Sequence, residues 1–279
     1  TYTMVNLAAT TFGQLLLISG DSSGYFFFVL AAVFYACSLF PTALSTSSAP
    51  QPLVRPKLDI KTLWLNSPIA VVAVFLVGVS NSSYGTLAAV YGQQIGLDVA
   101  SIALLVSITI LTGAVFQLPV GWLSDRTDRR AVLIALASIA GIVDLFFLVF
   151  QPRDVTTVLV ASAIFGAMVY AMYPVIVAHA NDHADKNSFL RISSGLLLVF
   201  GAGSILGPLL GGGMMALFGP DALFGTTLLA HIITVGFAGW RMTKRAQVED
   251  DMKGDFVTIS TVRMNTPETA TLDPRTDEE

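Results

Sequence analysis

The feature that most constrains this chain is a series of long apolar runs, each close to the length needed to cross a bilayer. A membrane-spanning helix takes about 20 mostly apolar residues. Eight such runs are present, at roughly residues 1–20, 24–44, 67–91, 100–121, 131–150, 154–178, 191–218 and 220–241. Of all residues 54% are hydrophobic and 12% are charged, whereas a soluble domain carries about 25% charged residues. The sequence therefore predicts an all-α membrane protein with about eight transmembrane helices.

Lysine and arginine lie almost entirely on one side of these runs. If the chain crosses the membrane eight times, the loops at 45–66, 122–130 and 179–190 share one side with the C-terminal tail. All but one of the 15 Lys and Arg residues lie in these segments or at the adjoining helix ends, and the exception is Arg153. Loops on the cytoplasmic side carry this excess of basic residues. We therefore expect a multi-pass protein of the plasma (inner) membrane with both termini in the cytoplasm.

Two segments do not have the composition of a membrane helix. Residues 45–66 begin with a stretch rich in Ser, Thr and Pro, which predicts a cytoplasmic linker. Residues 242–279 are polar and acidic, which predicts a disordered cytoplasmic tail. Much of the acid lies in this tail, so the net charge of -4 gives no indication of a nucleic-acid partner. The linker separates two helices in residues 1–44 from a six-helix unit in residues 67–241.

A short charged loop separates the fourth apolar run from the fifth. Five of the six residues 125–130 are charged, and Gly121 and Leu123 precede them. This order of Gly, Leu, Asp and Arg, followed by an Arg pair, resembles the loop signature of the major facilitator superfamily of secondary transporters. One departure is Asp128, where the family pattern has Gly, although Asp also tolerates turn geometry.

A glycine-rich motif lies in the seventh apolar run. Its residues Gly203, Gly207, Pro208, Gly211 and Gly212 resemble the Gly-Pro-Gly-Gly signature of antiporter members of the same family. Pro208 removes one helical hydrogen bond and permits a kink, and small residues let membrane helices approach closely. The motif indicates either a bend that moves during transport or a tight seal against leakage. A static packing face is the alternative.

The resemblance implies a fold of two six-helix halves joined by a cytoplasmic loop. The six runs after the linker would be the second half, and residues 1–44 would hold the last two helices of the first half. Together with the charged loop and the glycine-rich motif, Tyr173, Pro174 and residues 178–182 resemble the YcaD-like subgroup of bacterial transporters. The chain begins at Thr1, and we expect the first four helices of the fold to be missing from it. Such a chain should not form a sealed pathway, so we expect it to be inactive alone.

In the family, the acid of the charged loop and its arginine partners form a cytoplasmic latch that holds one conformation of the transport cycle. The residues that match this latch are Gly121, Asp125, Arg126, Arg129 and Arg130. A simpler interpretation is that the positive residues only keep the loop in the cytoplasm. That interpretation would require neither Gly121 nor Asp125.

The family fold also implies a substrate cavity, lined mainly by the third and sixth apolar runs. The polar residues that we assign to it are Asn81, Ser83, Tyr84, Tyr170, Tyr173 and Gln14. Uncharged polar groups together with tyrosines suit a neutral or amphipathic small molecule. For any single residue, the alternative is an ordinary hydrogen bond between helices.

Two ionisable residues lie inside apolar runs, Asp144 in the fifth and His231 in the eighth. Charge inside a bilayer is expensive and often marks a proton path, so a proton relay is one interpretation. However, the family fold places both runs at its periphery. At 1.5 Å per residue Asp144 lies only about 9 Å from the outer end of its run, where it could reach the interface. The depths of the two residues also match poorly for a mutual pair.

The segment 179–185 holds two histidines and two aspartates, which are possible metal ligands. Its position at the end of a helix favours a solvated loop instead. We expect His179 and Asp182 to cap the helix or to pair with Lys186 or Arg191, and we predict no metal site.

Together these features predict a secondary active transporter of small solutes that works by alternating access, is coupled to protons and can act in efflux. The expected partners are the lipid bilayer, a small-molecule substrate and the proton, and we expect no cofactor, no nucleic acid and a monomer at full length. An intramembrane enzyme would need a catalytic set at membrane depth, but Asp144 stands alone there, so we expect no enzyme. The sequence also has no Walker loop, which argues against ATP-driven transport. A non-transporting membrane scaffold or receptor on the same fold is the alternative.

Overall fold

The computed structural model describes residues 2–20, 24–44, 60–182 and 189–244, which are helical apart from short turns. In chain order the helices are α1 (Tyr2–Leu16), α2 (Phe26–Ala43), α3 (Ile60–Asn66), α4 (Pro68–Gln94), α5 (Val99–Arg126), α6 (Arg129–Phe150), α7 (Val155–Asn181), α8 (Phe189–Phe218) and α9 (Leu223–Met242). Two short 3-10 helices, η1 (Leu17–Ser19) and η3 (Pro220–Ala222), precede α2 and α9. The all-α prediction is therefore confirmed for the described residues.

Six of the described helices, α4 to α9, are long and apolar enough to cross a bilayer. Helix α1 has 15 residues, so at 1.5 Å per residue it is about 22 Å long, less than the roughly 30 Å of a hydrocarbon core. In α2 the apolar stretch Phe26–Pro41 is likewise short. Six membrane-length helices are confirmed, whereas the predicted number of eight is not.

The predicted linker and tail fall largely outside the described residues. Residues 60–66, at the end of the predicted linker, form helix α3. Residues 45–59 of the linker and residues 245–279 of the tail are outside the described part of the chain.

The long helices begin at polar residues that cap their first turns. The Asp98 side chain accepts a hydrogen bond at the start of α5, and the Asp154 carboxylate accepts one of 2.9 Å from the Thr157 backbone amide at the start of α7. That amide and the Thr157 hydroxyl hold the pKa of the Asp154 carboxyl below its ordinary value. Ser67 caps α4, and Pro68 occupies its first turn, where a missing amide hydrogen leaves no bond unmade. These caps set where each helix enters the bundle.

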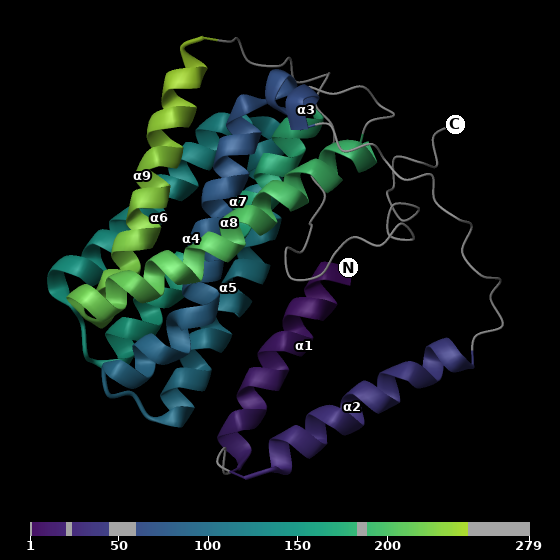
Figure 1. The fold of residues 1–279 in the computed structure, drawn as a ribbon, viewed down its shortest axis with the longest axis vertical. Helices are drawn as coiled ribbons and strands as arrows, with labels where there is room; N and C mark the ends of the chain where they lie inside the picture. The colour runs from purple at the N-terminus through teal and green to yellow at the C-terminus, as the bar shows by residue number, and fades with distance from the viewer. Residues whose placement is uncertain (1, 21–23, 45–59, 183–188, 245–279) are drawn as a thin grey trace.

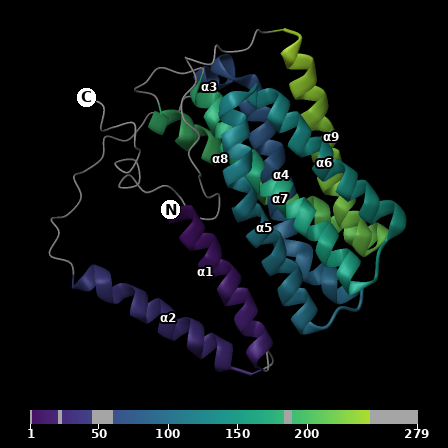
Figure 2. The ribbon, with the colours of Figure 1, turned by 180° about the vertical axis from the view of Figure 1, so that it is seen from behind.

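The helices α4 to α9 form one bundle, and α1 and α2 stand beside it (Figures 1 and 2). Within the bundle α4 packs on α8 and α9, α5 packs on α7, and α6 packs on α7 and α9. Helix α1 lies against α5. Helix α2 points away from the bundle in both views, and its apolar side chains, such as Phe28 and Tyr35, are exposed. In a membrane these side chains would face lipid or further helices.

Glycines bring two helix pairs into backbone contact. A Cβ atom added to Gly203 of α8 would overlap the Phe75 carbonyl oxygen of α4, and one added to Gly207 would overlap the Val79 carbonyl oxygen. A Cβ atom added to Gly166 of α7 would likewise overlap the backbone of α5. Because only glycine fits at these points, the glycines fix how closely α4 approaches α8 and α7 approaches α5.

The two ends of the bundle differ in charge. At one end α4, α6 and α8 begin and α5, α7 and α9 finish, and we call it the basic end. Its described Lys and Arg residues are Lys61, Arg126, Arg129, Arg130, Arg191, Arg241 and Lys244. The opposite end holds Arg153, between α6 and α7. The uneven charge matches the bias that the sequence predicts for a cytoplasmic face.

Candidate functional site

The charged loop forms the centre of an ion-pair cluster at the basic end. Arg129, at the start of α6, donates a 2.7 Å hydrogen bond from Nε to the Asp182 carboxylate just after α7. Its NH2 lies 3.1 Å from Asp125 Oδ1 on the last turn of α5, an ion pair that is not aligned as a hydrogen bond. A weaker bond of 3.4 Å joins Arg129 to the Ser124 hydroxyl. One guanidinium therefore ties together the ends of three helices.

Burial of the Arg129 side chain strengthens its contacts with the two aspartates. The Arg129 side chain is 1% exposed and the Asp182 side chain 3%, whereas Asp125 is 35% exposed. A buried charge must be paired because transfer out of water is costly, and the two carboxylates meet this need for Arg129. The Asp182 contact contributes most, since the Asp125 contact is partly screened by water.

The other arginines of the loop have different partners. Arg130 binds Asp128 through two nitrogens, with NH2 2.7 Å from Oδ2 and Nε 3.0 Å from Oδ1. Partial burial opposes ionisation of Asp128, but the bonds from the Arg130 side chain and amide outweigh it and lower the Asp128 pKa. Arg126 lies over the Trp122 ring, 4.2 Å from its centroid, and is exposed. Of the predicted latch residues, the structure joins Asp125 to Arg129, and Gly121 is buried within α5 nearby.

Asp182 is the residue of this cluster that sequence reasoning assigned to other partners. The structure pairs Asp182 with Arg129 rather than with Arg191, and the other expected partner, Lys186, lies outside the described residues. The only signal in the sequence was that an acid ends α7 on the same side as the charged loop. His179, one turn earlier on α7, is buried.

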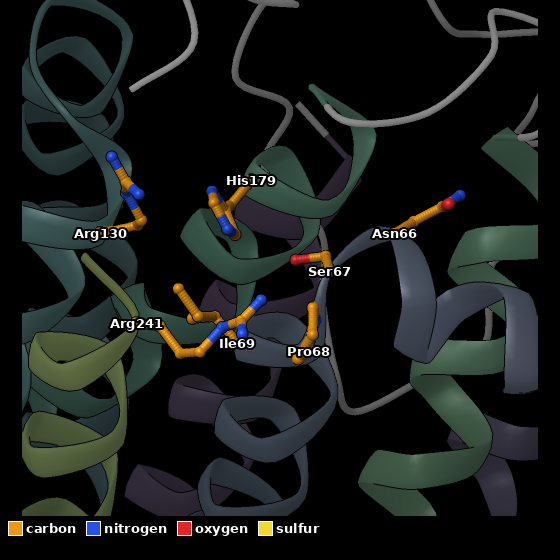
Figure 3. Close-up of a pocket in the computed structure, with 7 residues that line it drawn as sticks. All are labelled: Asn66, Ser67, Pro68, Ile69, Arg130, His179 and Arg241. Atoms are coloured by element: carbon orange, nitrogen blue, oxygen red, sulfur yellow. The ribbon is translucent and has the colours of Figure 1, made fainter. Parts of the chain in front are cut away.

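A small pocket lies beside the cluster at the basic end (Figure 3). It is lined by Asn66, Ser67, Pro68, Ile69, Arg130, His179 and Arg241, from α3, α4, α6, α7 and α9. Its volume of about 10 Å³ leaves room for about one water molecule. The basic side chains give the pocket positive character, although Arg130 is already bound to Asp128.

Asp144 and His231 form a second polar cluster in the interior of the bundle. His231 Nδ1 lies 2.6 Å from Asp144 Oδ2, and His231 Nε2 lies 3.2 Å from the Ser80 hydroxyl. The Thr227 hydroxyl donates a 2.6 Å bond to Asp144 Oδ1. The expectation that the depths of Asp144 and His231 match poorly is wrong, and so is the view that Asp144 stands alone or reaches the interface. Asp144 is 0% exposed, because α6 and α9 pack side by side and bring the two residues to the same level.

The order Ser80, His231, Asp144 has the connectivity of a hydrolase triad, but its surroundings do not suit catalysis. Ser80 is 0% exposed, so no substrate carbonyl can reach it in this conformation. It also lies in the middle of α4, where backbone amides are used by the helix and none is free to form an oxyanion hole. The cluster is a buried chain of hydrogen bonds that joins α4, α6 and α9.

Several predicted cavity residues lie in the core of this bundle. The Tyr84 hydroxyl is 3.0 Å from the Thr109 hydroxyl of α5, and its ring packs 4.9 Å from Phe165. Tyr173 is buried against Phe200, with ring centroids 5.3 Å apart. For Tyr84 and Tyr173 the contacts match the alternative of bonding and packing between helices.

The remaining cavity candidates differ in their contacts. Asn81 is 8% exposed, and neither amide atom has a hydrogen-bond partner among the described residues. Ser83 faces Gly207 of α8, and its hydroxyl likewise makes no bond within the described part. Tyr170 is half-buried, and its backbone carbonyl accepts a 3.3 Å bond from Gln117. Gln14 is half-buried on α1, away from the others. Asn81 is the strongest candidate, because a buried amide without partners calls for a ligand or a helix from outside the described residues.

The residues of the glycine motif have different surroundings. Gly203 and Gly207 contact α4 directly, and Gly211 faces Leu87 and Leu223 side chains, whereas nothing lies within 4 Å of a Cβ added to Gly212. Helix α8 continues through Pro208 to Phe218. These contacts favour a packing face between α4 and α8.

The amino-acid sequence is similar to those of known proteins. A sequence model of the Major Facilitator Superfamily matches residues 70–263. Two curated relatives, each described as an uncharacterized MFS-type transporter YcaD, are 29% identical over 154 residues in Shigella flexneri serotype 5b and over 148 residues in Salmonella arizonae. Each match covers 52% of this chain and 37% of the relative. The chain thus spans a little over a third of the length of the curated relatives it matches.

Proposed function

Because the chain belongs to the major facilitator superfamily, we propose that it forms part of a secondary active transporter that moves small solutes by alternating access. The observation that carries the proposal is the Arg129 cluster, which joins the ends of α5, α6 and α7 through one buried guanidinium. A fixed scaffold has no need of a buried ion pair at a helix junction, because apolar packing of the same volume is often as stable or more so. A latch that opens and closes during transport, in contrast, needs a contact that can break and reform, and an ion pair can do so.

In this proposal the Arg129 cluster is the latch of one conformation. With the Asp182 contact in place, the basic end is held closed, and breaking it lets the end of α7 separate from the turn between α5 and α6. The uneven distribution of Lys and Arg supports a cytoplasmic position for this end. The transporter would then lie in the plasma (inner) membrane with both termini in the cytoplasm.

The substrate would bind between this six-helix unit and helices outside the described residues. Asn81 supports this position, since its amide is buried and without hydrogen-bond partners among the described residues. Uncharged polar groups favour a neutral or amphipathic small molecule. We further propose that transport is coupled to protons and that efflux is its direction.

A transport screen tests this function. The full coding sequence that contains this chain would be expressed in cells deprived of their own efflux carriers, and export of a panel of neutral and amphipathic dyes and metabolites would be measured. We expect at least one compound to be exported, with export lost on addition of a protonophore and in the Arg129→Gln variant. If the protein reaches the membrane but exports none of the compounds, a non-transporting scaffold or receptor is the better account.

A further inference from the structure

We propose that Asp144 and His231 together form a binding site for a single proton inside the helix bundle. The inference rests on the proposed transport function for its role, because the bound proton would be the one that is exchanged during the cycle. The site itself is argued from the geometry of four side chains.

These side chains form one continuous chain of hydrogen bonds. His231 of α9 is 2.6 Å from Asp144 of α6 through Nδ1 and 3.2 Å from Ser80 of α4 through Nε2. The second carboxylate oxygen of Asp144 accepts a 2.6 Å bond from Thr227. Ser80, Asp144 and Thr227 are 0% exposed and His231 is 2% exposed. Every polar atom of the imidazole and the carboxylate therefore has a partner, and water has no direct contact with the pair.

The number of protons in the site follows from its charge. A carboxylate and a neutral imidazole together carry one net negative charge. When two protons are added to this state, the pair carries one net positive charge. With one proton the pair is neutral, either as carboxylate and imidazolium or as carboxylic acid and imidazole. Net charge in the interior of a membrane bundle is costly, so burial favours the state with one proton. A short bond between the two groups lets them share that proton.

Among the residues that the structure describes, no other charged group faces the pair. Ser80 faces it from α4, the Phe165 ring lies 6.1 Å from the His231 ring on the α7 side, and Thr227 faces it from its own helix. The nearest phenol along α4, that of Tyr84, is bonded to Thr109 of α5.

The charged groups of the packed helices lie at the two ends of the bundle. They are the Arg129 cluster at the basic end and the bidentate pair of Arg153 and Asp221 at the opposite end. Among the described spans, Asp144 and His231 are thus the acid and the base available at this depth.

Gain or loss of a proton at the pair would change the hydrogen bond that His231 makes with Ser80 of α4. When imidazole Nε2 carries no proton, it accepts the hydrogen of the Ser80 hydroxyl. When Nε2 is protonated, it donates to the Ser80 oxygen, and the hydroxyl hydrogen must turn to another acceptor. Ser80 is adjacent to the buried Asn81, and α4 is the helix held against α8 by Gly203 and Gly207. The proton state of the site therefore changes bonding on the helix that carries the strongest cavity candidate.

The proton balance of this step is simple. A proton from water on one side of the membrane forms one N–H or O–H bond in the pair. The same proton leaves to water on the other side when that side opens, and no oxidant or second reactant takes part.

Titration of the chain in lipid nanodiscs tests the site directly. Nitrogen NMR of the chain labelled with ¹⁵N-histidine would be recorded from about pH 5 to about pH 10, a range that brackets histidine and neighbouring titrations. The sequence contains three histidines, His179, His183 and His231, and the His231→Gln variant assigns the His231 signal. The infrared carboxyl band and the protons released per chain would be followed in the same samples.

The expected result is a change of the His231 signal and the carboxyl band at the same pH, with one proton per chain released in addition to those released by the His231→Gln variant. The release should be lost in Asp144→Asn and kept in the matched control His179→Gln. Thr227→Val keeps both ionisable groups but removes one bond to the carboxylate, so it should release one proton at a shifted pH even if Asp144→Asn folds poorly.

Two outcomes would overturn the proton site. One is a His231 signal that stays constant over the whole range, which would make the pair a static bond. The other is a release that is unchanged in Asp144→Asn. The titration needs no substrate, so its failure is separate from that of the transport screen: export with a silent His231 would refute the proton site, whereas a titrating pair without export would refute the transport function.

Discussion

The Arg129 cluster makes a quantitative prediction about the basic end of the bundle. In Arg129→Gln, Asp182 loses the guanidinium that binds it at 2.7 Å, while its side chain stays 3% exposed. Removing one partner of a buried ion pair costs about 3–5 kcal/mol. The Asp125 contact adds at most about 1 kcal/mol, because that carboxylate is 35% exposed. If the latch acts on the closed state alone, a loss of about 3 kcal/mol shifts the ratio of open to closed forms by roughly a hundredfold.

Thiol labelling measures this shift. Cys37 would be replaced by serine, and Ser124, which is 0% exposed and contacts Arg129, would be replaced by cysteine as a probe of opening. The labelling rate in membranes should rise roughly a hundredfold in Arg129→Gln. The control is Arg126→Gln, since Arg126 is exposed on Trp122; we expect a change of about twofold or less, as for most surface substitutions. Equal labelling rates in the two variants would refute the argument that Arg129 is the tie.

Three smaller predictions follow from other contacts. Gly203→Ala should destabilise the bundle by about 1–3 kcal/mol, because the new Cβ meets the α4 backbone, whereas Gly212→Ala should be neutral; equal unfolding curves in detergent would contradict this. Asp221→Asn should weaken the opposite end by less than the Arg129 change, since Arg153 is 43% exposed; proteolysis of the loop between α6 and α7 checks it. Asp128→Asn should lower stability by about 1–3 kcal/mol at neutral pH, because the Arg130 side chain is 6% exposed and loses its charged acceptor. Because the Asp128 pKa is lowered on folding, the difference from wild type should vanish as pH falls through that pKa; a difference that persists in acid would contradict it.

Much of the fold could be predicted from the sequence because apolar run length is a direct consequence of bilayer thickness. The six long helices appear where the runs are, and the caps Asp98 and Asp154 are visible as acids just before them. The two shorter N-terminal helices show the limit of this reasoning. An apolar run of sufficient length does not guarantee a helix of the same length, as the break at η1 and the end of α2 show.

The contacts within the candidate site were harder to predict, because they join residues far apart in the chain. The pairing of Asp144 with His231 links positions 87 residues apart, and run length gives only an approximate depth for each. The partner of Asp182 depends on how the end of α7 meets the start of α6, which no local pattern specifies. By contrast, Asp125 and Arg129 are separated by four residues, and their contact could be expected from the loop alone.

The accessibility of Asn81 from each side of the membrane distinguishes alternating access from a static bundle. In the full-length protein with all native cysteines replaced by serine, Asn81→Cys would be treated with membrane-impermeant thiol reagents in right-side-out and in inverted vesicles. Alternating access predicts labelling from both faces, and Arg129→Gln should raise the rate from the basic end and lower it from the opposite end. Labelling from neither face, or from one face with no response to Arg129→Gln, would contradict the account.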